Sequence, residues 1–153
     1  MIVRKADVLD VQRLGPRMRW EDRIEATLAS GLPPEVALKN SFHESDMCWA
    51  IERNFSAVAI AGVGAANEKT KGLVGVPWLL SSDELRTRPC QTMTALKQIL
   101  QEIKLLYPML INFVFADNKV AIKMLCHLGF KIADEPIQYG EQKVLFYRFW
   151  MGF

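Results

Sequence analysis

The stretch Val114–Phe130, VFADNKVAIKMLCHLGF, joins an apolar run to an amphipathic segment that closes on Leu-Gly-Phe. The apolar residues before Asp117 predict a buried strand, and Asn118 stands where a helix N-cap accepts hydrogen bonds from free N–H groups. Residues 118–128 have helical spacing, and Gly129 is a typical left-handed stop. This order predicts a strand, a capped helix and a following strand inside an α/β domain.

Outside this stretch, apolar patterning and turn residues predict the remaining elements. Strands are expected at residues 2–6, 46–53, 56–66, 73–81, 109–115, 130–133 and 144–150. Helices are expected at residues 8–14, 17–30, 34–45, 89–107 and 118–128. The order β-α-α-α-β-β-β-α-β-α-β-β predicts a mixed sheet flanked by helices, in a single domain over residues 1–153, with some parallel pairing in its second half.

The composition excludes several classes of protein. The net charge is +2, and the arginines near the start are interleaved with acidic residues, so no nucleic-acid binding is expected. No apolar run approaches the roughly 20 residues of a membrane span, and the first residues have no signal-peptide pattern. The widely spaced Cys48, Cys90 and Cys126 form neither a metal motif nor a disulfide framework, which favours a reducing cytoplasm.

Asn118, Ala121, Gly129 and Phe130, placed after a buried strand, resemble the last conserved part of the GNAT acyltransferase family. The resemblance implies the acyl-CoA N-acyltransferase fold. It also implies acetyl-CoA or CoA as the cofactor if the site of the fold is retained. In that family, the asparagine caps the helix and joins the ends of two splayed strands.

A narrower resemblance is carried mostly by residues 76–130, and the later blocks PIQYG at 136–140 and FYRFWM at 146–151 add to it. The segment VPWLL at Val76–Leu80 is its most distinctive piece. These blocks are similar to GNAT-like internal virion or virion-assembly proteins of T7-like and other tailed bacteriophages. The resemblance implies phage virion or assembly proteins as partners, with self-association left open. It places the protein in the host bacterial cytoplasm during infection, with packaging into the virion as a further option.

The loop SSDELRTRPCQ, Ser81–Gln91, corresponds to the family's phosphate-binding loop, which is usually Gln/Arg-x-x-Gly-x-Gly/Ala. This loop has no glycine, and its Asp83 and Glu84 repel phosphate. Guanidinium groups bind phosphate well, so Arg86 and Arg88 compensate in part for the missing glycine and for the two acidic residues. With the preceding strand residues and the asparagine, the candidate cofactor-binding residues are Leu79, Leu80, Arg86, Arg88 and Asn118. The loop is not expected to hold the cofactor in the family's usual way.

The proton-transfer residues of the family are also incomplete. The position of the usual tyrosine, seven residues after the asparagine, holds Leu125, and the neighbouring Cys126 points elsewhere round the helix. The fourth strand offers no carboxylate as a base, which leaves Glu52 as a weak candidate beside Cys126; Glu44 and His43 have less support. No metal-binding set is present.

Aromatic residues supply candidates for a protein interface, namely Trp78, Tyr139 and Trp150, with core packing as the alternative. We therefore expect a phage protein with a role in virion assembly or inside the particle, without efficient acetyl transfer. The alternative is an acetyl-CoA-dependent N-acetyltransferase that acts on a host or phage amine.

Overall fold

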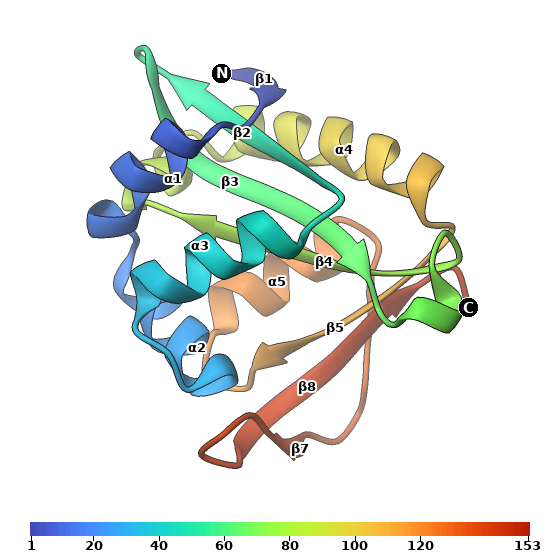
Figure 1. Ribbon diagram of the computed structural model, residues 1–153. Coiled ribbons are helices and arrows are strands. Elements are labelled where there is room, and N and C mark those ends of the chain that lie inside the picture. Colours follow the sequence, from blue (N-terminus) through green and yellow to red (C-terminus); the bar gives the residue numbers. More distant parts are fainter.

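Eight strands form one sheet in the computed structural model, which describes residues 1–153 (Figure 1). The strands are β1 Ile2–Lys5, β2 Met47–Arg53, β3 Ser56–Ala65, β4 Val74–Ser81, β5 Met109–Phe115, β6 Lys131–Ile132, β7 Ile137–Tyr139 and β8 Val144–Met151. Their order across the sheet is β1-β2-β3-β4-β5-β8-β6, and β7 pairs with β8. Every pairing is antiparallel except that of β4 with β5.

Helices cover both faces of the sheet. They are α1 Val8–Leu14, α2 Trp20–Ser30, α3 Pro34–Glu44, α4 Pro89–Leu106 and α5 Lys119–His127. One buried cluster includes side chains of α4 and α5, and a second includes side chains of α1 and α3 against the opposite face. Figure 1 shows α1, α2 and α3 together in front of the sheet and α4 behind it. None of the helices is long and apolar enough to cross a membrane.

The parallel strands β4 and β5 pair only where they begin. Val74 lies opposite Met109 and Gly75 opposite Leu110, and the two strands diverge beyond these pairs (Figure 1). Close approach at the narrow end needs a glycine, because a Cβ at Gly75 would lie 2.6 Å from the ring of Tyr107. The divergence leaves main-chain groups of both strands without a neighbouring strand.

The predicted fold is confirmed: the sheet is mixed, helices flank it, and all seven predicted strands and five predicted helices are present. Asn118 caps α5 through a hydrogen bond from the N–H of Ala121, and Gly129 has φ +95°. The short β7 was not predicted, because three residues give too little pattern. The crossover through α5 does not create a second parallel pair, because β8 lies between β5 and β6.

Candidate functional site

A cavity of about 820 Å³ opens where β4 and β5 diverge. Its walls come from α2, the end of β4, the loop after β4, the first half of α4, and α5. Because α2 covers one face of the sheet and α4 and α5 cover the other, the cavity passes through the gap between the strands. A ligand that enters between α4 and α5 therefore meets, at the gap, groups that belong to the opposite face.

The end of β4 directs main-chain groups into this gap. The N–H of Ser81 donates to Asp22 Oδ2 at 2.8 Å, and the carbonyl of Ser81 accepts from the N–H of Arg19, also at 2.8 Å. Both groups of Ser81 thus point away from β3. Alternate residues of a strand point the same way, so the N–H and carbonyl of Leu79 also face the gap. Pro77, two residues earlier, loses no sheet hydrogen bond there, because its nitrogen faces the gap as well.

The narrow part of the gap is closed by Asn112 of β5. Its Nδ2 donates to the carbonyl of Pro77 at 2.7 Å, and its Oδ1 accepts from the N–H of Phe113 at 2.8 Å. One amide side chain therefore bridges two diverging strands that have no direct hydrogen bond at this level. Leu79 remains as the residue of β4 whose main chain is open to a ligand.

A buried polar network lies beside the end of β4. Arg19 donates from Nε to Asp22 Oδ1 at 2.8 Å and from Nη2 to Asn118 Oδ1 at 3.0 Å. Arg19, Asp22 and Asn118 are each at most 5% exposed. Burial raises the pKa of the Asp22 carboxyl, and the guanidinium of Arg19 opposes this rise. The network fixes the start of α2 against the end of β4 and the start of α5.

Glu25 lies one turn further along α2, in the cavity wall. Its Oε1 accepts a hydrogen bond of 2.6 Å from the N–H of Phe115, another main-chain group that has no partner strand. Burial of the carboxyl group is the main reason that the pKa of Glu25 is raised from 4.5 to about 7. The hydrogen bond from Phe115 lowers this pKa, and the negative charge of Asp22 raises it. A carboxyl group that titrates near neutral pH inside a cavity is suited to exchange protons with a ligand.

Two buried polar atoms next to this network have no partner in the chain, Ser82 Oγ and Asn118 Nδ2. Such atoms are rare in folded proteins, because each forfeits a hydrogen bond that it makes in water. The amide of Asn118 nevertheless lies near enough to Glu25 to favour the charged carboxylate. The unsatisfied groups indicate that the region is completed by water or by a ligand.

The outer part of the cavity is basic. Arg86, Lys97, Lys123 and His127 line it, and the two lysines form no ion pair. Arg86 already forms ion pairs with two carboxylates, since its Nη2 lies 2.7 Å from Asp83 and 3.8 Å from Glu21. No side chain caps the start of α4, so the N–H groups of its first turn that follow Pro89 lack a side-chain acceptor. These donors fit the diphosphate of CoA, and the Leu79 main chain fits its amides, without a glycine loop.

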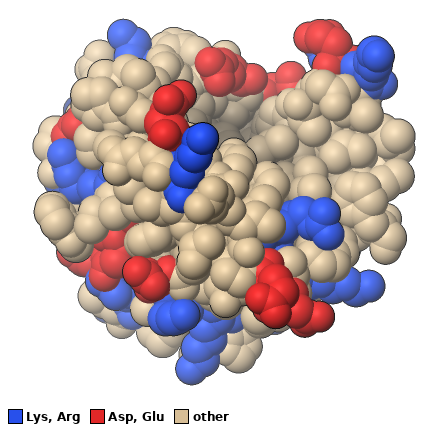
Figure 2. Space-filling view, turned by 90° about the horizontal axis from the view of Figure 1, so that it is seen from below, with Lys and Arg blue, Asp and Glu red and all other residues tan.

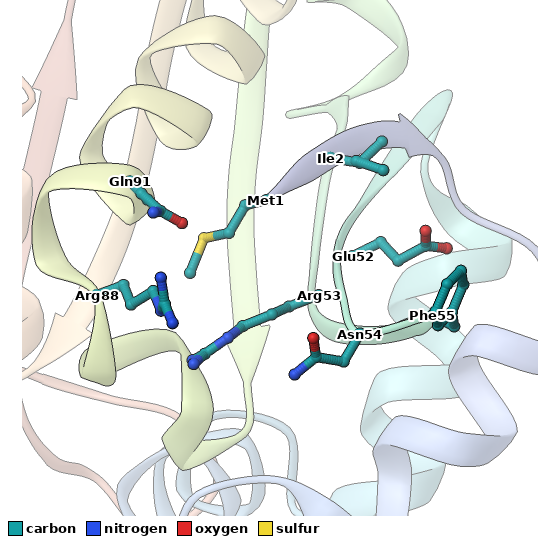
Figure 3. A pocket seen from close by; sticks show the side chains of 8 residues that line it. All are labelled: Met1, Ile2, Glu52, Arg53, Asn54, Phe55, Arg88 and Gln91. Atoms are coloured by element: carbon teal, nitrogen blue, oxygen red, sulfur yellow. The ribbon is translucent and has the colours of Figure 1, made fainter.

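Arg88 lies in a different hollow from Arg86. This hollow, of about 420 Å³, is lined by the N-terminal residues, the β2–β3 hairpin and the start of α4. Figure 3 shows Arg53 and Arg88 projecting into it beside Met1. The prediction that Arg86 and Arg88 act on one ligand therefore does not fit the structure, because the two side chains line different hollows.

The two weak catalytic candidates are also displaced from the cavity. Glu52 lines the hollow of Figure 3 and pairs with Arg4 at 2.9 Å. Cys126 is exposed and does not line the cavity, because it lies on the outer face of α5. Leu125 is buried in the core, so no side chain replaces the tyrosine there. His127, in contrast, lines the cavity.

The other predicted residues divide between the cavity and the core. Leu79 lines the cavity, and Asn118 caps α5 beside it. Leu80 is 8% exposed and belongs to the cluster on the opposite face of the sheet, because its side chain alternates with that of Leu79. The side chain of Leu80 therefore faces away from the cavity.

The three aromatic interface candidates make contacts within the chain. The ring of Trp78 lies over Gly62, and its Nε1 donates to Ser45 Oγ at 2.7 Å. Tyr139 stacks on Phe113 with ring centroids 4.3 Å apart. The guanidinium of Arg148 lies 5.0 Å from the centroid of Trp150. All three side chains are half-buried, so part of each stays accessible to a partner, and their place in an interface stays a prediction.

Charges of both signs are scattered over the face seen from below, and no patch of a single sign covers it (Figure 2). No three histidine, cysteine or acidic side chains come together in a way that could hold a metal ion. The polar cavity between β4 and β5 is therefore the site with the most developed chemistry.

Sequence reasoning missed the acidic and basic residues of α2. Arg19, Asp22 and Glu25 recur at intervals of three, which places them on one side of the helix. The same segment carries Arg17, Glu21 and Arg23, so the charges of this stripe served only as an argument against nucleic-acid binding. The spacing was the available signal, and the position of the stripe against the end of β4 was not readable from the sequence.

Comparison with known proteins gives the fold a name. No family model matches the chain, and no curated protein matches it in sequence. Among solved structures, a ribosomal-protein-alanine N-acetyltransferase from Brucella melitensis has a TM-score of 0.72 at 18% identity, covering 99% of each chain. A GNAT superfamily phosphinothricin acetyltransferase from Sinorhizobium meliloti, solved in complex with AcCoA, has a TM-score of 0.71 at 12% identity, covering 98% of this chain and 86% of that one.

A GNAT family acetyltransferase from Streptococcus pneumoniae gives a TM-score of 0.65 at 14% identity, with 98% of each chain covered. The chain thus has the fold of GNAT N-acetyltransferases over nearly its whole length. At these identities the likeness describes the fold, and none of these structures links the chain to phage virion proteins.

Proposed function

We propose that this protein binds an acyl-CoA in the cavity between β4 and β5 and transfers the acyl group to an amine. The observation that carries the proposal is Glu25, a buried carboxyl group whose pKa is raised to about 7, in the wall of a cavity that reaches both faces of the sheet. When bound, acyl-CoA supplies an acyl group activated as a thioester.

The residues of the chain have separate tasks in this proposal. Lys97, Lys123 and Arg86 bind the diphosphate at the outer end of the cavity. The free N–H and carbonyl of Leu79 orient the amide-bearing arm, and the N–H stabilises negative charge on a carbonyl oxygen placed against it. Two proton transfers complete the reaction, one from the attacking amine and one to the departing sulfur.

Glu25 accepts the proton that the amine loses as its nitrogen forms the new bond to the acyl carbon. The bond from that carbon to sulfur breaks, and the departing sulfur takes a proton from the ring of His127 or from water. The raised pKa of Glu25 makes the carboxylate a stronger base than an exposed glutamate, and the site works best above about pH 7, where the group is ionised.

The test is thiol release from acetyl-CoA with a panel of amines, comprising a peptide N-terminus, a lysine peptide and spermidine. For Glu25→Gln we expect a loss of at least about 100-fold in rate with CoA binding unchanged, since a positioned base contributes about 10²–10⁴-fold. Glu44→Gln is the control, because Glu44 is an exposed carboxylate that does not line the cavity. Equal rates for wild type and Glu25→Gln would refute the role of Glu25.

A second candidate is a role in the assembly or interior of a tailed-phage particle, with phage proteins as partners. It is favoured by Leu125, which is buried where the acyltransferase pattern has a tyrosine, and by the glycine-free loop after β4. Detection of the protein in purified particles or assembly intermediates would support this role. Normal particles from a deletion phage would contradict it.

A further inference from the structure

A second cavity, which we call the apolar chamber, adjoins the polar cavity on the side of the core. It measures about 90 Å³. Leu79 and Met124 line both spaces, so the two lie next to each other. Twelve of the thirteen lining residues are hydrophobic, and the remaining one is Pro77. The chamber therefore offers no side-chain charge to a ligand.

The chamber lies on the α4 and α5 side of the diverging strands. Ala61 of β3 and Leu100 of α4 belong to its wall, and Phe149 of β8 stands edge-on to Phe130 at 5.2 Å. Trp78 also reaches it, although its indole N–H is already bonded to Ser45 on the other face. The wall is apolar because the strands diverge inside the main core, and interiors are normally packed without such spaces.

The two neighbouring spaces differ sharply in chemistry. The outer cavity carries lysines, an arginine and the free main chain of Leu79, whereas the chamber beyond Leu79 is apolar throughout. A ligand that fits both has a long polar and anionic part followed by a short hydrocarbon end. An acyl-CoA with more carbons than acetyl has this form, whereas acetyl-CoA leaves the chamber empty.

We infer that the chamber selects the acyl group and that the preferred donor is a short straight-chain acyl-CoA of about four to five carbons; this inference rests on the proposed function. The size follows from the volume, because a dry apolar cavity of about 150 Å³ takes a benzene molecule. A chamber of about 90 Å³ takes two or three carbons beyond acetyl, and a chain of eight carbons exceeds it.

The test is isothermal titration calorimetry of the full chain with CoA, acetyl-CoA, butyryl-CoA and octanoyl-CoA. Each buried methylene is worth about fourfold in affinity, so butyryl-CoA is expected to bind about tenfold or more tighter than acetyl-CoA. Octanoyl-CoA is expected to bind more weakly than butyryl-CoA. Thermal stabilisation by each ligand, measured in parallel, should give the same order.

Variants that fill the chamber test whether the preference for butyryl-CoA arises there. Ala61→Ile is expected to abolish the preference for butyryl-CoA while leaving the affinity for acetyl-CoA unchanged. Leu100→Phe, in the opposite wall and only half-buried, is the second filling variant if Ala61→Ile does not fold. Leu105→Phe, on the same helix and 87% exposed, is the matched control and should behave as wild type.

The outcomes separate this inference from the proposed function. Binding of acetyl-CoA as tight as that of butyryl-CoA in the wild type would overturn the inference and leave the proposed function standing. A butyryl preference that survives both filling variants would also overturn it. Absence of binding by CoA and by all three acyl-CoAs would remove the proposed function and the inference together.

Discussion

Replacement of Glu25 by glutamine is expected to stabilise the protein at neutral and alkaline pH. The folded state holds the Glu25 proton up to about pH 7, whereas the unfolded chain releases it near pH 4.5. Between these values the folded state binds more protons than the unfolded state, so the free energy of unfolding of the wild type falls as pH rises. Glutamine does not titrate, and its side-chain oxygen can still accept the hydrogen bond from Phe115.

The size of the effect follows from the two pKa values. At about 1.4 kcal/mol for each pKa unit, a rise from 4.5 to about 7 corresponds to a loss of about 3 kcal/mol once Glu25 is ionised. The Glu25 side chain is half-buried as a whole, so this figure is an upper limit for the pH-dependent part of the difference. The same raised pKa of Glu25 lowers the stability of the folded protein at neutral pH and makes the carboxylate a stronger base in the proposed reaction.

The assay is urea unfolding of wild type and Glu25→Gln at several pH values from 4.5 to 8.5. The free energy of unfolding of the variant should rise steadily relative to that of the wild type from pH 4.5 to 7. Above pH 7 the difference between the two should be constant. Glu44→Gln, an exposed control, should show no pH-dependent difference. A difference for Glu25→Gln that stays the same at every pH would refute the reasoning, because it would mean that Glu25 titrates alike in both states.

Three further changes test the fold around the site. Arg19→Met leaves the buried Asp22 without its partner, so a loss of about 3–5 kcal/mol is expected in urea unfolding; no loss would contradict the network. Gly75→Ala brings a Cβ to 2.6 Å from Tyr107 and should cost about 1–3 kcal/mol, measured in the same way; wild-type stability would show that the strands can separate there freely. Phe55→Gly should raise stability by about 1 kcal/mol, because Phe55 is 95% exposed at φ +65°, and a lowered melting temperature would contradict this.

The parts of the fold that were predictable are those set by local sequence. Asn118 and Gly129 mark the two ends of α5 because capping and left-handed φ depend on a few neighbouring atoms. Pro89 and the apolar spacing after it likewise predicted α4. The strand β7 escaped prediction, because its three residues are held by pairing with β8 and not by a pattern of their own.

The candidate site was harder to predict, because it is assembled from segments that are distant in the chain. Glu25 accepts from Phe115, 90 residues away, and Arg19 donates to Asn118, 99 residues away. Charge patterning on α2 describes which residues share a side of the helix, but the packing of that helix decides which of them are buried. Arg88 was a sequence-based candidate for a phosphate contact. Its side chain lines the hollow beside Met1 and does not line the cavity between β4 and β5.

The central claim is that the space between β4 and β5 binds an acyl-CoA, and titration calorimetry with acetyl-CoA and CoA tests it most directly. The account predicts micromolar dissociation constants for the wild type. It also predicts binding at least about tenfold weaker for the double variant Lys97→Glu, Lys123→Glu, whose exposed lysines line the outer cavity. Lys104→Glu, an exposed change further along α4, is the control and should bind as wild type. No heat and no thermal stabilisation of the wild type at millimolar ligand would contradict the account.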